Sequence, residues 1–295
     1  MIAAGEGWTP PPTRELTAAD GRVVRYCCYG PPDGRPVVSL AGTPGTRWER
    51  PDVVRAFEQA GLHVAAPDRP GYGGSTRQPG RSVADVAADV ALIADALGWP
   101  RFAVTGFSGG GPHALACAAL LAGRVTWCAV VGSPAPADAE GVDFFADRTP
   151  GSAEDFRLAR RGEQALRPYL EARGREAMTR FEADPDQAPG RPAAPDSGRL
   201  TRLRASFVGG LDGWIDDDIA LVRPWGFDPG RITGPVSIWH GVQDTKVPRA
   251  HTAWLLAQLP GAQSYEHPGG HDPDDATYRQ ILNWLARLMI AEPGQ

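Results

Sequence analysis

The amino-acid sequence predicts an α/β protein with a mostly parallel, doubly wound sheet that is interrupted by a helical insertion. Short apolar runs alternate with helix-period patterns from residue 22 to 133, and again from residue 235. Runs such as RFAVTG, at 101–106, are apolar almost throughout, which is typical of strands buried on both faces of a parallel sheet. The chain between these parts instead holds loops rich in Pro, Asp and Gly, with helical stretches and no convincing strand. The expected parts are a core formed by 1–133 and 231–295 and an inserted helical cap formed by 134–230.

The individual elements follow from local patterns. Strands are predicted from short apolar, β-branched or aromatic runs that Gly or Pro bounds, and they are expected at 22–30, 36–42, 63–68, 101–106, 125–133, 235–241 and 262–268. Helices are predicted where apolar residues recur every three or four positions, and they are expected at 49–60, 82–98, 109–122, 153–183, 198–208, 214–222, 248–259 and 275–291. The helix at 82–98 has the clearest ends, because Ser82 and Asp85 form a capping-box pair and Gly98 follows its last turn.

Composition limits the partners and the environment of the chain. Its 295 residues suit one large domain or a core with an insertion, and the formal net charge of −5 gives no basis for binding nucleic acid or an anionic membrane. No apolar run approaches the ~20 residues that span a bilayer, and the N-terminal residues lack the basic and apolar regions of a signal peptide. The four cysteines fit small buried side chains better than a disulfide framework. We therefore expect a soluble, cytoplasmic protein whose oligomeric state the sequence leaves open.

The stretch VTGFSGGGPHALACAAL, at 104–120, places Ser108 among glycines between an apolar strand and an Ala-rich helix. Its centre fits the pattern G-x-S-x-G, with Gly106 and Gly110 on either side of the serine. In a sharp strand-to-helix turn the central side chain projects, and both glycines must lack a side chain so that neighbouring backbone can approach. The amino end of the next helix would favour a developing negative charge. A purely structural turn is the alternative, but the position between strand and helix favours presentation of a nucleophile.

A serine hydroxyl is a weak nucleophile at neutral pH and needs a base, which is usually a histidine oriented by a carboxylate. The segment SIWHGVQDTKVP places Asp244 just beyond a predicted strand, and SYEHPGGHDPDD places His271 in the loop after the next strand. Open parallel sheets bind their ligands beyond the carboxyl ends of the strands. We therefore predict Ser108 as nucleophile, His271 as base and Asp244 as the orienting acid.

These segments, together with DRPGYGGS at 68–75, resemble the landmarks of an α/β-hydrolase with a cap domain, over roughly residues 15–291. The resemblance implies the chain order Ser, Asp, His, with the acid after the strand that follows the cap and the histidine in the last strand–helix loop. Asp244 and His271 match those positions. It further implies a helical cap with an apolar underside and chemistry that requires no cofactor and no metal.

The same resemblance implies an oxyanion hole made of two backbone N–H groups. One belongs to the residue after the nucleophile, here Gly109. The other comes from a loop commonly written His-Gly-x-Pro, which reads AGTPG at 41–45 in this chain, so that Thr43 would supply the second donor. Ala41 departs from the family pattern, and we expect the loop to be supported in a different way.

Other histidines and acids compete for these roles. The main alternative base is His267, near the expected strand end, and the alternative acid is Asp138, after the preceding strand. Asp272 would face solvent or cap the last helix, and the resemblance implies a structural role for Asp68. The remaining histidines show no catalytic constellation; they are His63, His113, His240 and His251. Of these, His113 lies on the predicted helix after Ser108 and could line the pocket.

Two features of the insertion invite further interpretations. The triplet Asp216-Asp217-Asp218 could indicate a metal site, but no spaced His or Cys accompanies it, and acids in a first helical turn stabilise a helix start. We therefore predict a helix start there rather than a metal site, and no G-x-G-x-x-G follows a first strand to indicate a dinucleotide. The aromatic residues of the insertion are expected to pack it and, in part, to line an acyl pocket; they are Phe144, Phe145, Phe156, Phe181, Phe207, Trp214, Trp225 and Phe227.

The sequence thus predicts a serine hydrolase that transfers an acyl group to water. The default substrate is a small or medium apolar carboxylic ester, with a lactone or a thioester nearly as favoured. The resemblance separates the chain from capped dehalogenases and epoxide hydrolases, which use an aspartate nucleophile where this chain has Ser108. A proline-iminopeptidase-like aminopeptidase, a carbon–carbon bond hydrolase or a perhydrolase would use the same three residues. A small-ligand binding protein with an idle site is the alternative from a different class.

Overall fold

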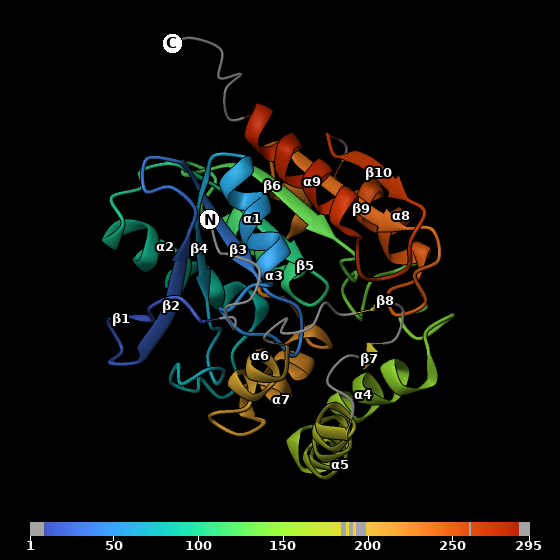
Figure 1. The fold of residues 1–295 in the computed structure, drawn as a ribbon. Helices are drawn as coiled ribbons and strands as arrows, with labels where there is room; N and C mark the ends of the chain where they lie inside the picture. Colours follow the sequence, from blue (N-terminus) through green and yellow to red (C-terminus); the bar gives the residue numbers. More distant parts are fainter. Residues whose placement is uncertain (1–8, 184–186, 189–190, 193–198, 260, 289–295) are drawn as a thin grey trace.

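The computed structural model describes residues 9–183, 187–188, 191–192, 199–259 and 261–288, and eight strands among them form one sheet (Figure 1). The strands are β1 (Arg14–Thr17), β2 (Val23–Tyr29), β3 (Arg35–Leu40), β4 (Leu62–Pro67), β5 (Phe102–Phe107), β6 (Val125–Val131), β9 (Val236–Gly241) and β10 (Gln263–His267). Their order is β1-β2-β4-β3-β5-β6-β9-β10. β2 runs antiparallel to β1 and β4, whereas the other neighbouring pairs are parallel. The predicted α/β class with a mostly parallel sheet is therefore confirmed.

Helices cover both faces of the sheet, because alternate residues along a strand point to opposite sides. The flanking helices are α1 (Pro51–Gln59), α2 (Val86–Ala96), α3 (Gly110–Leu120), α8 (Arg249–Gln258) and α9 (Asp275–Leu288). On one face α1 and α9 contribute Phe57 and Leu285 to the core. On the other face α2, α3 and α8 contribute Ile93, Leu115 and Leu255. All five side chains are completely or almost completely buried, so the two cores fix the sheet from both sides.

The predicted ends of the helix at 82–98 are present in the structure. The Ser82 N–H donates to Asp85 Oδ2 over 2.6 Å, which is the capping-box bond. A 3₁₀ turn over Val83–Asp85 then leads into α2. Gly98 adopts φ +69°, a conformation that glycine reaches without steric cost, and the chain leaves the helix there.

Between β6 and β9 the chain forms a group of helices that lies at one end of the molecule (Figure 1). They are α4 (Pro150–Arg161), α5 (Glu163–Ala183), α6 (Arg199–Ser206) and α7 (Asp212–Leu221), and a 3₁₀ turn follows at Pro229–Arg231. Leu166, Leu170 and Ile215 form a small apolar core there, and Tyr72 of the loop after β4 packs into it. We call residues 132–235, between the two strands, the intervening segment.

Several sequence-based expectations for the elements are wrong. The helix expected over 153–183 is two helices, because Gly162 takes φ +93° and separates α4 from α5. The intervening segment was expected to hold no strand, yet β7 (Gln187–Ala188) and β8 (Arg191–Pro192) pair there. β1 was also not expected. β7 and β8 have two residues each, and β1 has four with one apolar side chain, so none shows a readable alternation.

The topology places the loops after β3 and β5 next to each other. β4 pairs with one edge of β3, and β5 pairs in parallel with the other edge. The connections after β3 and β5 therefore lead away in different directions, and a crevice opens beyond the carboxyl ends of the two strands. This is the point at which the sequence places Thr43 and Ser108.

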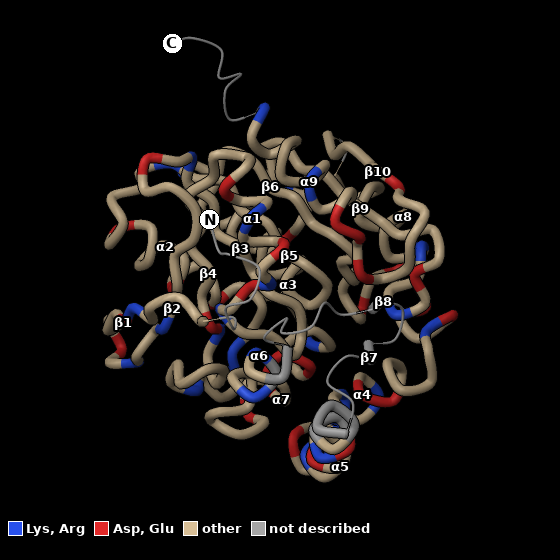
Figure 2. Tube along the Cα trace, viewed as in Figure 1, with Lys and Arg blue, Asp and Glu red and all other residues tan. Residues whose placement is uncertain are grey.

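Charged side chains of both signs are distributed along the chain (Figure 2). On α5, for example, Arg167 lies one turn from Glu163 and pairs with it at 2.5 Å. Within the described residues, no helix combines the length and the apolar character that crossing a bilayer requires.

Candidate active site

Ser108 occupies a sharp turn between β5 and α3. Its φ is +52°, which is uncommon for a residue with a side chain and marks local backbone strain. The Ser108 N–H donates to the Val131 carbonyl of β6 over 2.8 Å, and its carbonyl accepts from the Gly111 N–H over 2.9 Å. A Cβ on Gly106 would collide with the Gly110 carbonyl, so a side chain at position 106 is incompatible with this turn. The turn thus fixes the serine with its hydroxyl at the carboxyl end of the sheet.

The hydroxyl of Ser108 begins a continuous hydrogen-bonded row with His271 and Asp244. His271 Nε2 lies 2.8 Å from Ser108 Oγ, and His271 Nδ1 lies 2.7 Å from Asp244 Oδ2. Because a carboxylate only accepts, Nδ1 carries the proton and donates to Asp244, which leaves Nε2 free to accept from the serine O–H. The structure therefore brings together the three side chains predicted from three separate segments.

Asp244 is buried and fully hydrogen-bonded. Its second carboxylate oxygen, Oδ1, accepts the backbone N–H groups of Lys246 and Val247, each over 2.9 Å. Burial alone would raise the pKa of Asp244, but the bonds from His271 and from the two N–H groups outweigh it and hold this pKa below its ordinary value. The carboxylate is consequently ionised at neutral pH and can stabilise an imidazolium at His271.

The ring of His271 is held by close packing as well as by Asp244. Its centroid lies 5.1 Å from that of Phe107, the last residue of β5. On another side it approaches Gly132, where a Cβ would lie 3.2 Å from the ring atoms Nδ1 and Cε1, and where φ is +56°. Gly132 is not among the site residues predicted from the sequence. Its position directly after β6, beside the predicted nucleophile strand, is the signal that could have indicated it.

The two backbone N–H groups predicted to form an oxyanion hole come from adjacent segments. A Cβ on Gly109 would lie 2.8 Å from Thr43 Cβ and 3.3 Å from Thr43 N, so the backbone of Gly109 passes directly beside Thr43. Within the described part of the chain, neither N–H donates a hydrogen bond. Gly109 also precedes the amino end of α3, where unpaired N–H groups favour negative charge. The arrangement can therefore receive an oxyanion next to Ser108.

The loop at 41–45 is supported by Arg69, which lies in the segment DRPGYGGS. Arg69 Nη1 donates to the Ala41 carbonyl, and Arg69 Nη2 donates to the Gly42 carbonyl over 2.8 Å. A guanidinium thus holds the loop in which Ala41 replaces the expected histidine. The segment 68–75 is recognisable from the sequence, but no role was predicted for its arginine.

A cavity of about 620 Å³ opens onto these residues. The core contributes Ser108, Gly109, Thr43 and His271 to its wall. The intervening segment contributes the aromatic side chains of Phe156 and Trp214, and it also contributes ionisable side chains; these are Arg148, Asp155, Arg173, Arg202 and Asp218. The wall above the serine is therefore partly charged rather than purely apolar.

The other described residues of the predicted aromatic set pack on one another or on Phe156 and Trp214 and do not themselves line the cavity. Phe144 makes edge contacts with Phe145 and Phe156, Phe207 stacks on Trp214, and Trp225 stacks on Phe227. The side chain of Phe181 lies outside the described ones. Of the eight aromatic residues predicted to pack the insertion, the structure places two on the cavity wall.

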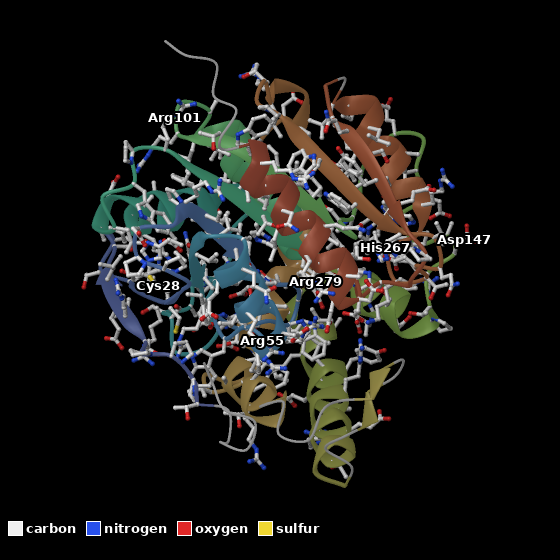
Figure 3. The ribbon with its side chains drawn as sticks, turned by 45° about the horizontal axis from the view of Figure 1, so that its top comes forward. Cys28, Arg55, Arg101, Asp147, His267 and Arg279 are labelled. Atoms are coloured by element: carbon white, nitrogen blue, oxygen red, sulfur yellow. The ribbon has the colours of Figure 1, made fainter. Side chains whose placement is uncertain are left out.

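The competing histidines lie apart from the hydrogen-bonded row. His267 is the last residue of β10 (Figure 3). Its side chain is buried. Burial lowers the pKa of His113 and of His251 to about 3, so both stay neutral. His113 Nδ1 bonds the Gly109 carbonyl, His251 contacts Arg148 and the Ala135 N–H, His240 contacts Thr252, and His63 packs edge-on against Trp99.

The competing acids also have other positions. Asp138 is exposed, and the carboxylate that contacts His271 is that of Asp244. Asp272 is exposed near Lys246, 3.6 Å from its Nζ. Asp68 is buried and accepts from the Arg47 backbone N–H over 2.6 Å and from the Arg47 guanidinium. Asp68 therefore ties two loops of the core together.

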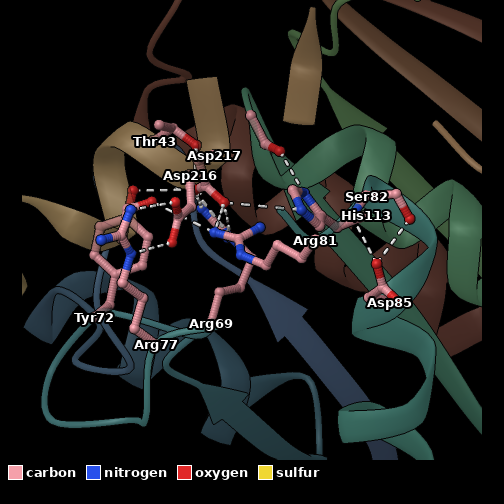
Figure 4. Close-up of polar contacts among 12 residues, drawn as sticks. Thr43, Arg69, Tyr72, Arg77, Arg81, Ser82, Asp85, His113, Asp216 and Asp217 are labelled. Carbon is pink, nitrogen blue, oxygen red and sulfur yellow. Dashed lines mark hydrogen bonds and ion pairs between the residues drawn. The ribbon is translucent and has the colours of Figure 1, made fainter. Parts of the chain in front are cut away.

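The prediction that Asp216, Asp217 and Asp218 start a helix is wrong. α7 begins at Asp212, so the triplet lies inside the helix and is buried. Asp216 binds Arg77, and Asp217 binds Arg69 and Arg81, all three from the loop after β4 (Figure 4). The acids hold α7 against the core. Among the described residues, no group of three or more His, Cys, Asp or Glu side chains is placed to hold a metal ion.

Residues 35–273 match the α/β hydrolase fold family. Epoxide hydrolase A of Mycobacterium tuberculosis is 34% identical over 128 residues, which span 42% of this chain and only 39% of that protein. A non-heme chloroperoxidase of Streptomyces lividans is 29% identical over 261 residues, which span 83% of this chain and 87% of that protein. The enol-lactonase structure from Burkholderia xenovorans LB400 superposes with a TM-score of 0.67 at 18% identity, covering 94% of this chain and 100% of that one. With this family match over most of its length and the same fold in solved structures, the chain belongs to the α/β hydrolase fold family.

Proposed function

We propose that this protein is a serine hydrolase that cleaves a small or medium carboxylic ester, lactone or thioester through an acyl-enzyme on Ser108. The observation that carries the proposal is the unbroken row from Ser108 Oγ through His271 to Asp244, with contacts of 2.8 and 2.7 Å. Such a row lets a neutral serine attack at the moment when a base takes its proton. The row opens into a cavity that can hold a substrate of moderate size.

The reaction follows from this geometry in two acyl transfers. His271 Nε2 takes the hydroxyl proton while Ser108 Oγ bonds to the carbonyl carbon, and the carbonyl oxygen becomes an oxyanion facing the N–H groups of Thr43 and Gly109. The oxyanion collapses, the bond to the leaving group breaks, and the imidazolium gives its proton to that group. Water then repeats the attack with His271 as base, which releases the acid and restores Ser108.

The helices α4 to α7 act in this proposal as a cap over the serine. Phe156 and Trp214 give the cavity an apolar surface for an acyl chain, while Asp155 and Asp218 make part of the same wall polar. A substrate that carries both an apolar and a polar part fits this wall better than a purely aliphatic ester. The family resemblance gives epoxide hydrolases an aspartate nucleophile, and this chain has Ser108 at that position.

Similarity to a non-heme chloroperoxidase over 83% of this chain favours one second candidate, perhydrolysis. Hydrogen peroxide would replace water in the second step, so that the acyl-enzyme would yield a peracid and free Ser108. Peptidase and carbon–carbon bond hydrolase activities use the same three residues, and an idle site would make the protein a ligand-binding relative. These alternatives are outcomes of the experiment below.

The proposal is tested by intact-mass analysis after treatment with a fluorophosphonate, which reacts with activated serines. We expect one adduct on the parent, none on Ser108→Ala, and one on Ser133→Ala, which removes a second buried serine near the site. Turnover by the unlabelled parent is then measured with p-nitrophenyl acetate and butyrate, with and without hydrogen peroxide, and with a proline arylamide. A folded parent without adduct and without turnover would overturn the proposal in favour of a binding protein. Cleavage of the arylamide alone would assign a peptidase.

A further inference from the structure

Asp217 lies where α7 meets the loop that carries Thr43. Its carboxylate has no exposed surface, and four side chains donate to it (Figure 4). Arg69 Nη2 and Arg81 Nη2 lie 2.5 and 2.6 Å from its oxygens, Thr43 Oγ1 lies at 2.7 Å, and the Tyr72 hydroxyl at 3.0 Å. The bond from the Tyr72 hydroxyl links Asp217 to the apolar core of the intervening segment, because Tyr72 packs into that core.

Asp217 is ionised despite its burial. Burial alone would raise its pKa, but Arg69 and Arg81 outweigh that effect and hold the pKa of Asp217 far below its ordinary value. A buried charge of this kind is stable only with its partners in place, since loss of one partner leaves the others uncompensated. The carboxylate of Asp217 and the guanidinium groups of Arg69 and Arg81 therefore have to be present together.

The same groups hold the Thr43 side of the proposed oxyanion hole. Thr43 Oγ1 donates to Asp217 and accepts from Arg69 Nη2 at 3.1 Å, so its side chain is fixed from two directions. Arg69 also binds the carbonyls of Ala41 and Gly42, the two residues before Thr43. The peptide that carries the Thr43 N–H is thus held on both sides by groups that Asp217 orients.

The Gly109 side of the proposed hole lies near the same carboxylate. His113, one turn into α3, donates from Nδ1 to the Gly109 carbonyl over 2.9 Å in its neutral form. Its Nε2 lies 3.9 Å from Asp217 Oδ1. Asp217 and its partners therefore adjoin the segments of both donors, although Asp217 itself touches neither N–H.

We propose that Asp217 is a positioning residue that sets the oxyanion hole from α7, so that the hole is complete only while α7 is seated on the core. The inference rests on the proposed function, because it concerns the stabilisation of an acyl-transfer oxyanion. Donors must lie within ~2.7–3.1 Å of the oxyanion, and loss of one typically costs ~10²–10³ in kcat. A shift of the 41–45 loop by several tenths of an ångström is enough to leave that range.

The chain offers a matched control in the adjacent residue. Asp216 is on the same helix, is also buried and also pairs with an arginine, since Arg77 Nε and Nη2 each lie 2.8 Å from its carboxylate. Among the described residues, Asp216 makes no hydrogen bond or ion pair with the 41–45 loop. Asp217→Asn and Asp216→Asn therefore remove the same charge from neighbouring positions, and only the first removes it from the oxyanion loop.

The experiment measures kcat and KM separately with p-nitrophenyl butyrate for the parent, Asp217→Asn and Asp216→Asn. We expect Asp217→Asn to lower kcat by about 10² with KM within about threefold, and Asp216→Asn to leave both within about threefold. Should Asp217→Asn fail to fold, Thr43→Val removes one bond to the carboxylate and leaves the other three donors in place; it is expected to lower kcat at least tenfold.

The outcomes separate this inference from the proposed function. A parent that neither reacts with a fluorophosphonate nor turns over an ester would defeat the proposed function. An active parent with an unchanged kcat in folded Asp217→Asn, or in Thr43→Val where Asp217→Asn does not fold, would overturn the role of Asp217 alone. Equal losses in Asp216→Asn and Asp217→Asn would assign the effect to docking of α7 in general and would overturn the proposed role of Asp217 as the positioning residue.

Discussion

Gly109 offers a direct test of how closely the two proposed oxyanion donors must approach, through the substitution Gly109→Ala. The residue has φ −57° and ψ −17°, which alanine adopts without strain, so the backbone itself does not oppose the change. The added Cβ would lie 2.3 Å from Thr43 Oγ1 and 2.8 Å from Thr43 Cβ, whereas ordinary contacts begin at 3.4 Å. Because Thr43 Oγ1 is held by Asp217 and Arg69, the two segments must separate by about 1.1 Å, which is the shortfall at that atom.

The size of the effect follows from that displacement. Alanine at a compatible site gains about 0.4–1 kcal/mol by restricting the unfolded chain, while overpacking costs about 1–3 kcal/mol. The net loss of stability is thus at most about 2–3 kcal/mol, and the fold should persist. A separation of about 1.1 Å moves one donor out of the range that an oxyanion requires. Since a misplacement of ~1 Å can cost ~10² in rate, we expect kcat/KM to fall by about 10- to 100-fold.

The assay is steady-state hydrolysis of p-nitrophenyl butyrate, with thermal unfolding to confirm that each variant is folded. Gly123→Ala is the matched control, because a Cβ on this exposed turn residue would meet nothing within 4 Å. It should retain the parent kcat/KM. If folded Gly109→Ala also retains it within about threefold, the reasoning that places Thr43 and Gly109 as a pair of donors is refuted.

Two further predictions concern buried titratable groups. Burial, with Asp155 and Asp217 nearby, raises the pKa of Asp218 well above its ordinary value, so the folded state keeps a proton that the unfolded chain releases above about pH 4. The free energy of unfolding should therefore fall as pH rises from about 4 through the folded pKa of Asp218. Asp218→Asn should remove this contribution, which is measured from the urea midpoints of both proteins between pH 4 and 8. The same dependence of the midpoint on pH in parent and variant would contradict the prediction. Burial also raises the pKa of the Cys117 and Cys128 thiols, so iodoacetamide at pH 8 should modify them only after unfolding; modification of native protein, found by peptide mass mapping, would count against it.

Most of the fold could be predicted because its signals are local. The alternation of apolar runs with helical spacing requires only neighbouring residues, and it leads directly to a covered parallel sheet. The candidate site was accessible for the same reason: Ser108, Asp244 and His271 each follow a strand within a short recognisable segment, and parallel strands bring such loops to one edge. The topology of the sheet then brings together the three side chains, which lie in separate segments of the sequence.

The parts that failed depend on contacts between distant residues. Asp217 pairs with arginines more than 130 positions earlier, as separations of 148 and 136 residues show, and no local pattern reports such a pairing. A run of acids suggests a helix start when it is considered alone, but the arginines of the 68–81 region stabilise it inside a helix. The ionisable side chains on the cavity wall were also not predicted, because only the aromatic residues of the insertion indicated a pocket in the sequence.

The anchoring of α7 also bears on the engineering of chimeras within this family. Exchanging the helical segment between relatives is an obvious way to alter substrate preference. Here such a graft would remove Asp217 and leave Arg69 and Arg81, whose side chains are each 2% exposed, without a counter-charge. An orphaned buried charge costs about 3–5 kcal/mol, a large part of the stability of an ordinary domain. A transplant into this scaffold should therefore retain α7 with the recipient, or carry residues 69 and 81 along with the donor segment.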